Sequence, residues 1–254
     1  ERVTEGNALE EIASLPQIVS GFSEEGIQKA KALFLLLTKK VITVTPLEAE
    51  LTKLFANAYR YIHFSIANQF YMIASANQVD FSRIYDAMVE DYPRMKNFPR
   101  PGLTAGPCLL KDTMQLSAFA KNNFNLGHAA MFVNEFMPQH IIDKIKVTTD
   151  LKSKKVGILG MAFKAESDDK RDSLSYKLHR LLKLEAREVY ASDEYIKNDH
   201  FVSKEELIER SDLIIIGAPH HAYRSLKLEG KDVFDIWNSV SASETASMGR
   251  PISC

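Results

Sequence analysis

One uninterrupted stretch limits the possible folds more than any other, because residues 47–77 contain neither glycine nor proline. At 1.5 Å per residue, a helix over this stretch would be about 45 Å long. Its apolar residues fall on nearly every side, and a helix of that kind is buried over most of its surface. A spine shared between subunits is one way to bury it. The pattern therefore predicts a long helix at the centre of a homodimer or a higher homo-oligomer.

The composition is that of an ordinary globular chain, with 45% hydrophobic and 26% charged residues among 254. The formal net charge is −1, so neither a nucleic-acid-binding surface nor a basic membrane-binding patch is expected. No apolar run approaches the roughly 18–20 residues of a membrane span. With only two cysteines, the chain shows no secreted disulfide framework, and a reducing, cytoplasmic setting is expected.

The residues before the long helix have α/β character. β-branched runs predict strands at 18–22 and 41–45, and helices are expected over 4–14 and from Ser23, as the capping residue, to Leu37. Glu1 is followed at once by a helical pattern, and there is no initiator methionine. We therefore expect residues 1–45 to be the end of an N-terminal α/β domain whose beginning is absent.

The rest of the chain divides into a helical part and a second α/β part. After the long helix, helices are expected at 80–91, 108–121 and 127–147, the last with a kink at Pro138. From residue 151 onward, strands and helices alternate, which indicates a parallel sheet. The expected domains are the N-terminal remnant (1–45), a central helical domain (46–150), a C-terminal Rossmann-like α/β domain (151–238) and a poorly ordered tail (239–254).

The segment 106–112 joins a loop rich in glycine and proline to a helical pattern. Proline suits the first turn of a helix, so Cys108 is expected near a helix N-terminus, where unpaired N–H groups favour a thiolate. Asp112 lies one turn later and can share a face with Cys108. A thiol with a carboxylate above it suits a nucleophile and its base. The alternative is a small buried cysteine, but the loop and the spacing favour the nucleophile.

Lys53 and Asn57 lie four residues apart on the long helix and share one face. An ammonium and an amide that point into a cleft would stabilise the oxyanion formed when a carbonyl undergoes addition. The alternative is a surface lysine beside a surface asparagine. Glu1 and Glu5 have the same spacing, and they are either a solvated helix start or carboxylates that direct water.

The segment 157–164 follows an expected strand but lacks the Gly-x-Gly-x-x-Gly pattern, so it is a weak signal for a dinucleotide site. Lys164 and Arg171 still place cations beside a βα turn, where α/β sheets bind phosphates. A charged surface loop is the alternative. His220 and His221 have no cysteine or acidic residue at ligand spacing, so no metal site is expected.

Taken together, these segments resemble the nucleotide-sugar 6-dehydrogenases, which act on UDP-glucose, UDP-N-acetylhexosamines or GDP-mannose. The resemblance spans nearly all of residues 1–238 and rests on four ordered segments, 1–6, 50–57, 106–112 and 159–173. It implies an N-terminal NAD-binding Rossmann domain, a helical domain for dimerisation and catalysis, and a C-terminal α/β domain that covers the nucleotide. The chain looks like the end of the first domain and the other two, with the NAD fingerprint expected upstream of Glu1.

The family's reaction oxidises a sugar C6 alcohol to a carboxylate with two NAD⁺. By resemblance, Cys108 attacks the intermediate aldehyde, and the resulting thiohemiacetal is oxidised to a thioester that water hydrolyses. The loop 99–105 would line the substrate. The resemblance assigns oxyanion stabilisers that also bind substrate (Lys53, Asn57), carboxylates that direct water or protons (Asp112, Glu5), other substrate contacts (Glu1, Arg94 toward a neighbouring subunit, Pro101, Gly102, Phe163, Lys164) and cofactor contacts (Lys111, Arg171).

Two departures from the family leave the sugar and the base open, although a UDP-sugar is favoured. Ala105 precedes Gly106 where the family more often has glycine, and the segment 235–238 lacks an arginine that some members carry. A β-hydroxyacid-type dehydrogenase also places a lysine and an asparagine four residues apart on a long helix, but it leaves Cys108 and the second α/β domain unexplained. A catalytically silent module that binds a nucleotide sugar and dimerises is the third interpretation.

Overall fold

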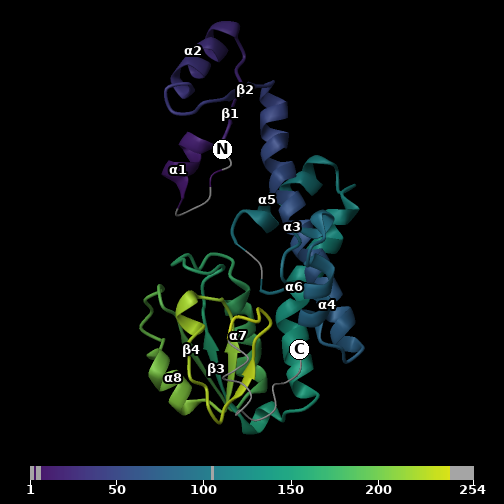
Figure 1. The fold of residues 1–254 in the computed structure, drawn as a ribbon, viewed down its shortest axis with the longest axis vertical. Helices are drawn as coiled ribbons and strands as arrows, with labels where there is room; N and C mark the ends of the chain where they lie inside the picture. The colour runs from purple at the N-terminus through teal and green to yellow at the C-terminus, as the bar shows by residue number, and fades with distance from the viewer. Residues whose placement is uncertain (1–2, 4–6, 104–105, 241–254) are drawn as a thin grey trace.

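The computed structural model of the 254-residue chain describes residues 3, 7–103 and 106–240 (Figure 1). The long helix α3 (Pro46–Ala76) connects a small N-terminal group of elements with a helical part and a four-stranded sheet. Within these described ranges, no helix combines the length and the apolar character that a membrane span requires. The expected α/β class, with parallel sheets and one long helix, is confirmed.

The N-terminal group consists of α1 (Ala8–Ser14), β1 (Gln17–Val19), α2 (Glu24–Phe34) and β2 (Val41–Thr43). The two strands are parallel, with Ile18 opposite Ile42. Ser23 caps α2, because its Oγ accepts a hydrogen bond from the Gly26 N–H at 3.1 Å. Both strands are shorter than expected, and α2 ends at Phe34 rather than Leu37.

The start of α3 is fixed by a capping box. The Thr45 Oγ1 accepts from the Glu48 N–H at 3.4 Å, and the Glu48 carboxylate accepts from the Thr45 N–H at 2.7 Å. Pro46 occupies the first turn, where its missing N–H has no cost. Thr45 is therefore the cap of the helix, and its expected place at the end of a strand is wrong.

Among the described residues, one face of α3 is covered by other elements of the chain. Buried residues of that face include Tyr61, Ala67 and Asn68, and the face packs against α5 (Leu109–Phe119) and α6 (Asn125–Lys146). Large apolar side chains on another face are exposed, so the part of the chain that the structure describes does not bury the helix on most sides. These exposed residues are Phe55, Tyr59, Ile66, Phe70 and Ile73.

The helical part also contains α4 (Phe81–Val89) and the short helix η1 (Pro93–Met95). The Asp80 side chain caps α4 by accepting from the Ser82 N–H at 2.8 Å. α6 continues through Pro138, and the kink there stays a prediction. These helices match the expected ones with small shifts at their ends, which is the usual uncertainty of helix boundaries.

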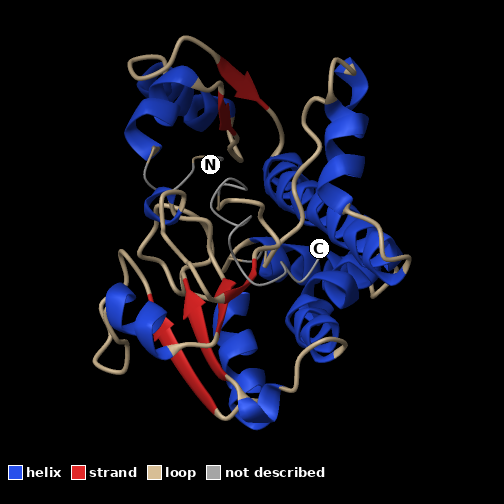
Figure 2. Cartoon of the chain, turned by 60° about the horizontal axis from the view of Figure 1, so that its bottom comes forward, coloured by secondary structure: helices blue, strands red, loops and turns tan. Residues whose placement is uncertain are grey.

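The C-terminal part forms a four-stranded sheet in the order β4-β3-β5-β6, with every neighbouring pair parallel (Figure 2). This confirms the parallel α/β arrangement expected from the alternation of strands and helices. The elements are η2 (Leu151–Ser153), β3 (Lys155–Leu159), α7 (Leu174–Glu185), β4 (Glu188–Ser192), α8 (Lys204–Arg210), β5 (Leu213–Ile216), η3 (His221–Tyr223) and β6 (Asp232–Phe234).

Each face of the sheet has its own core, as the period-two alternation of strand residues requires. Leu213 and Ile215 belong to a core that α7 covers, whereas Ile214 and Ile216 belong to a core that includes Leu207 of α8. The first core continues into α3, α4 and α6, through residues such as Met137. The helical and C-terminal parts therefore share one core, and their treatment as separate domains stays a proposal.

The end of the described chain is better held than expected. The composition predicts a poorly ordered tail from Ser239 onward, but the Asp235 carboxylate accepts from the N–H groups of Ser239 and Val240 at 2.6 and 2.9 Å. Val240 is buried in the second core. The expectation is therefore wrong for these two residues, and residues 241–254 lie outside the described ranges.

Candidate functional site

Cys108 stands immediately before the first residue of α5, as the Gly/Pro loop and the apolar spacing predict. The first hydrogen bond of the helix runs from the Asp112 N–H to the Cys108 carbonyl at 2.9 Å. The thiol is exposed, so the alternative of a small buried cysteine is wrong. An exposed thiol at a helix start is accessible to a carbonyl substrate.

Asp112 joins α5 to the long helix. Its carboxylate accepts a hydrogen bond of 2.6 Å from the Asn57 Nδ2, and both side chains are buried. The Lys111 ammonium lies 3.5 Å from the other Asp112 oxygen and is exposed. A buried carboxylate requires such partners because burial alone disfavours its charge. Two of the residues predicted from separate segments are thus in direct contact one turn above the thiol.

Lys53 lies one turn before Asn57 on α3 and is half-buried. It lines a cavity of about 70 Å³ together with Gln17 and Val3, where the N-terminal group meets the long helix. Asn57 is not among the residues that line this cavity and instead contacts Asp112, so a common cleft for Lys53 and Asn57 stays a prediction. Glu1 and Glu5 lie outside the described residues, so their roles stay predictions.

The loop before Cys108 is held from two sides at Gly102. The Gly102 N–H donates to the Asn68 Oδ1 at 2.8 Å, and Asn68 is fully buried. On the other side, a Cβ at Gly102 would lie 2.2 Å from the Trp237 ring, so only glycine fits. Pro101 is buried beside it. Trp237 follows β6, so this contact joins the loop to the C-terminal part.

A second contact joins the same loop to the turn after β3. Gly106 has a φ of +117°, which favours glycine, and a Cβ there would lie 2.8 Å from the Phe163 ring. The Lys164 ammonium is 5.6 Å from the centroid of that ring. The structure thus brings the predicted substrate contact Phe163 next to the glycine that is two residues before Cys108, and Lys164 follows it in the chain.

The remaining predicted cations form contacts within their own segments. The exposed Arg171 side chain donates to the Asp169 carboxylate from Nε at 2.9 and 3.1 Å and from Nη2 at 2.7 Å. Arg94 is exposed on η1 and donates to the Tyr92 hydroxyl at 2.9 Å. A role of Arg171 toward a cofactor and of Arg94 toward a neighbouring subunit both stay predictions.

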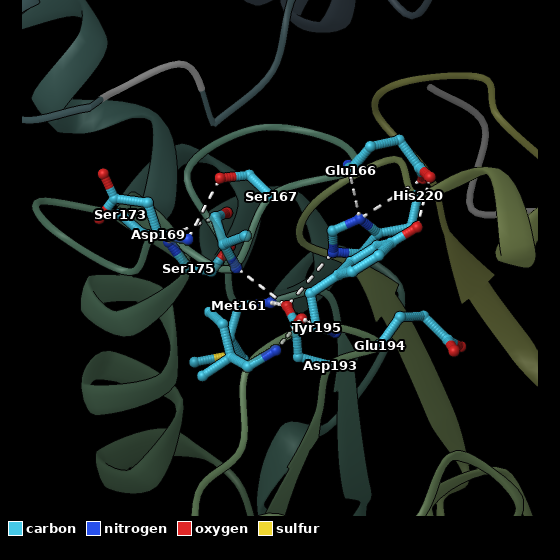
Figure 3. Close-up of polar contacts among 12 residues, drawn as sticks. Met161, Glu166, Ser167, Asp169, Ser173, Ser175, Asp193, Glu194, Tyr195 and His220 are labelled. Carbon is cyan, nitrogen blue, oxygen red and sulfur yellow. Dashed lines mark hydrogen bonds and ion pairs between the residues drawn. The ribbon is translucent and has the colours of Figure 1, made fainter. Parts of the chain in front are cut away.

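Asp193 is a central polar residue of the C-terminal part that the sequence did not single out (Figure 3). Its carboxylate, at the end of β4, accepts from the Met161 and Ala162 N–H groups at 2.6 and 3.0 Å. It also accepts from the Tyr195 N–H at 2.8 Å. Burial alone would raise the pKa of Asp193, but hydrogen bonds from His220 and from backbone N–H groups outweigh it and lower the pKa to about 2.

The position of Asp193 limits what this sheet can bind. In a dinucleotide-binding fold, the N–H groups of the turn after the first strand receive the pyrophosphate. Here the ionised Asp193 already occupies those of Met161 and Ala162. An acidic residue directly after the second strand of a βαβ unit is the sequence signal that could have directed attention to Asp193.

No group of three or more histidine, cysteine or acidic side chains within residues 3, 7–103 and 106–240 is placed to hold a metal ion. His220 is fully buried, and its Nε2 lies 3.3 Å from the Asp193 carboxylate. His221 is exposed. The two adjacent histidines therefore have different surroundings.

Comparison with known proteins identifies the family of the chain. Residues 47–136 match the central domain of the UDP-glucose/GDP-mannose dehydrogenase family, and residues 157–242 match the UDP binding domain of the same family. Together the two matches cover more than half of the chain.

The chain is 29% identical over 238 residues to the UDP-N-acetyl-D-mannosamine dehydrogenase of Pyrococcus horikoshii, covering 90% of this chain and 56% of that protein. It is 26% identical over 261 residues to an NDP-N-acetyl-D-galactosaminuronic acid dehydrogenase of Ralstonia solanacearum, covering 97% and 61%. A solved structure of a UDP-D-ManNAc dehydrogenase from Pyrococcus horikoshii superposes with a TM-score of 0.85 at 26% identity, covering 95% of this chain and 60% of that one.

The long helix joined to a parallel α/β sheet is thus the fold of nucleotide-sugar dehydrogenases. The chain belongs to the UDP-glucose/GDP-mannose dehydrogenase family. It spans between half and two thirds of the length of the relatives described above.

Proposed function

We propose that this chain carries the catalytic thiol and the nucleotide-sugar site of an enzyme that oxidises C6 of a nucleotide sugar to the carboxylate in two steps. A UDP-sugar is the favoured substrate, because residues 157–242 match the family's UDP binding domain. The names of the relatives, which include dehydrogenases of UDP-N-acetyl-D-mannosamine, support the same class of substrate. The match to a nucleotide-binding domain does not favour the β-hydroxyacid-type alternative.

The observation that carries the proposal is the contact between Gly106 and Phe163. Through this contact, the loop that ends at the exposed Cys108 packs against the turn that contains Lys164. The proposed nucleotide-sugar site therefore combines a thiol and a cation from distant segments of the chain. Lys164 is the proposed partner of the diphosphate, because an ammonium forms strong, charge-assisted hydrogen bonds to phosphate oxygens. The sugar then extends from the diphosphate toward Cys108.

The proposed role of Cys108 is addition to the C6 aldehyde, the product of the first oxidation. The sulfur forms a bond to the aldehyde carbon, and the aldehyde oxygen becomes an oxyanion that takes up a proton. Asn57 has two N–H groups, one of which is bound by Asp112, and with Lys53 it is the proposed donor to that oxyanion. After the second oxidation, the carbon is a thioester, and water releases the carboxylate and the thiol.

Asp112 is proposed to direct the water that hydrolyses the thioester. Its carboxylate is buried one turn above Cys108 and is oriented by Asn57, which fits a base that acts at short range. Glu5 is the second proposed carboxylate, and Glu1, Arg94, Pro101 and Gly102 are the other proposed substrate contacts. Gly102 itself is buried against Trp237, so its contribution is to let the loop approach closely.

The hydride acceptor is proposed to be NAD⁺, with Lys111 and Arg171 as its contacts. The four-stranded sheet of this chain is not the proposed dinucleotide site, because the turn after β3 lacks the Gly-x-Gly-x-x-Gly pattern that such a site requires. The steps assigned above are therefore those that the chain's own residues perform: addition of sulfur, stabilisation of an oxyanion, and activation of water.

We also propose that two chains associate through the exposed face of α3, since Phe55, Tyr59 and Ile73 are each more than half exposed there. Large contiguous apolar surfaces on a folded protein commonly mark contact sites between chains. A reducing compartment such as the cytoplasm suits the free thiol of Cys108.

Calorimetric titration with UDP and UDP-glucose tests the proposed site. The chain should bind both, and Lys164→Ala should weaken binding about ten-fold or more, because a charge-assisted hydrogen bond is worth roughly 1.5–3 kcal/mol. The control is Lys170→Ala, which removes an exposed lysine six residues along the same turn. Absence of UDP binding, or equal effects of the two substitutions, would contradict the proposal.

A further inference from the structure

The buried His220 connects the end of β5 to the turn that carries Phe163 and Lys164. Its Nδ1 accepts a hydrogen bond of 3.0 Å from the Glu166 N–H (Figure 3). A backbone N–H can only donate, so this nitrogen carries no proton and the proton is on Nε2. The Nε2–H faces the Asp193 carboxylate at 3.3 Å. Asp193 therefore fixes the neutral ring with its acceptor toward Glu166.

Glu166 needs such support, because its backbone is in the left-handed region with a φ of +53°. That region is unfavourable for a residue with a side chain and persists only where surrounding contacts hold it. The Glu166 carboxylate accepts from the His221 N–H at 2.7 Å and from the Tyr195 hydroxyl. The ring of His220 supplies the contact that holds the backbone itself.

The turn that contains Glu166 is also the turn that contacts the loop before Cys108. It is closed by a hydrogen bond of 3.1 Å from the Phe163 N–H to the Asp169 carbonyl. Within it, Lys164 precedes Glu166 by two residues, and Phe163 packs against Gly106. A change in the backbone at Glu166 would therefore move Lys164 and alter the packing on the Cys108 loop.

We propose that His220 is a positioning residue for the nucleotide, which holds Glu166 and thereby presents Phe163 and Lys164 to the diphosphate. This inference rests on the proposed function and adds a residue to it that does not itself contact substrate. A histidine that only filled the core would contribute to stability and leave the nucleotide affinity of the folded protein unchanged. The two roles thus predict different results for the same variants.

Two substitutions test the roles of the two ring nitrogens of His220 separately. His220→Gln keeps a donor that reaches Asp193 but offers no acceptor at the position of Nδ1. His220→Asn keeps an acceptor near that position and loses the donor. The control is His200→Gln, which makes the same change at an exposed histidine of the same α/β part. Circular dichroism and thermal unfolding establish that each variant is folded.

The affinity for UDP is measured by calorimetry, and amide hydrogen exchange is followed for residues 163–169 in the same proteins without ligand. Loss of one hydrogen bond that orders the turn should weaken UDP binding about five- to ten-fold in His220→Gln. His220→Asn should lie closer to the unsubstituted chain, and His200→Gln should match it. Exchange at 163–169 should be faster in His220→Gln, whereas α3 should exchange as before.

The outcomes distinguish the inference from the function on which it rests. Faster exchange with unchanged UDP affinity in His220→Gln would overturn the positioning role and leave the nucleotide site intact. Unchanged exchange would also overturn it, because Glu166 would then be held without His220. Failure of the unsubstituted chain to bind UDP would overturn the proposed function and this inference together.

Discussion

Among single residues, Asp193 determines which backbone N–H groups of the C-terminal sheet remain available to a ligand. Its side chain is completely buried, yet four backbone N–H groups and His220 surround it with donors. Hydrogen bonds of this kind favour the charged form of a carboxyl group and can outweigh burial. An internal anion thus takes the place at the βα turn that a phosphate group occupies in a dinucleotide-binding protein.

Acid unfolding measures the contribution of Asp193. Its pKa in the folded chain is about 2, below the ordinary value of 3.8, so the ionised group stabilises the fold above that ordinary value. This stabilisation, about 2–3 kcal/mol in full, is lost progressively as the pH falls toward 2. Between pH 6 and pH 3, the unfolding free energy of the unsubstituted chain should fall by about 1 kcal/mol more than that of Asp193→Asn.

Urea unfolding followed by circular dichroism at the two pH values gives this difference. Asp199→Asn removes an exposed carboxylate after the same strand and is the matched control for the loss of one negative charge. Equal losses of stability in Asp193→Asn and in the unsubstituted chain would show that the Asp193 carboxylate gains nothing from its surroundings.

At the scale of elements, the long helix was the most predictable part of the chain. Its bounds, Pro46–Ala76, lie within one residue of the expected 47–77, because no residue in the stretch interrupts a helix. The signal for its start is in the sequence, because Thr45 and Glu48 have the spacing of a capping box, although the β-branched run before Pro46 favours a strand that includes Thr45. The distribution of apolar residues predicted that the helix is buried, but it did not show which elements or which second chain would cover each face.

The site likewise could be predicted from the sequence only where its residues are close together in the chain. Cys108 and Asp112 could be placed together from the sequence, because both belong to one helix start and the i, i+4 rule relates them. The contact between Asn57 and Asp112 joins residues that are 55 positions apart, and no local pattern encodes it. Gly102 against Trp237 and Gly106 against Phe163 depend likewise on how α3, the loop and the sheet pack.

The exposed face of α3 predicts self-association. Light scattering at micromolar concentration should give a mass about twice the 28.7 kDa of one chain, because burial of Phe55, Tyr59 and Ile73 in a dimer removes apolar surface from water. The double variant Phe55→Asp and Tyr59→Asp should be monomeric. Leu184→Asp, at an apolar residue of α7 that is 82% exposed, is the control and should remain dimeric. A clean monomer in the unsubstituted chain would contradict the dimer.

At the scale of the whole molecule, the loop before Cys108 is the junction between the helical part and the C-terminal part. Asn68 of α3 holds it from one side, and Trp237 and Phe163 contact it from the other. The shared core beneath it extends from α3, α4 and α6 to β3, β5 and β6. Nucleotide bound at the C-terminal part would therefore be presented to a thiol that belongs to the helical part.

The same arrangement predicts selectivity between nucleotides. The chain should bind UDP, whose diphosphate is proposed to contact the Lys164 side chain, but show no micromolar binding of NAD⁺, because the turn after β3 lacks the Gly-x-Gly-x-x-Gly pattern of a dinucleotide site. Calorimetric titration of one preparation with UDP and with NAD⁺ tests this, and binding of UDP is the control for a folded protein. Micromolar affinity for NAD⁺ would show that the described residues include a dinucleotide site after all.

We propose above that Cys108 adds to the C6 aldehyde of a bound UDP-sugar. The most direct measurement is the ¹³C spectrum of UDP-6-aldehydo-glucose, labelled at C6, in the presence of the chain and without any oxidant. We expect a new signal from a carbon bonded to both sulfur and oxygen, and we expect it to be absent in Cys108→Ala although UDP still binds. A bound aldehyde that remains hydrated in the unsubstituted chain, or the same new signal in Cys108→Ala, would contradict the role of Cys108.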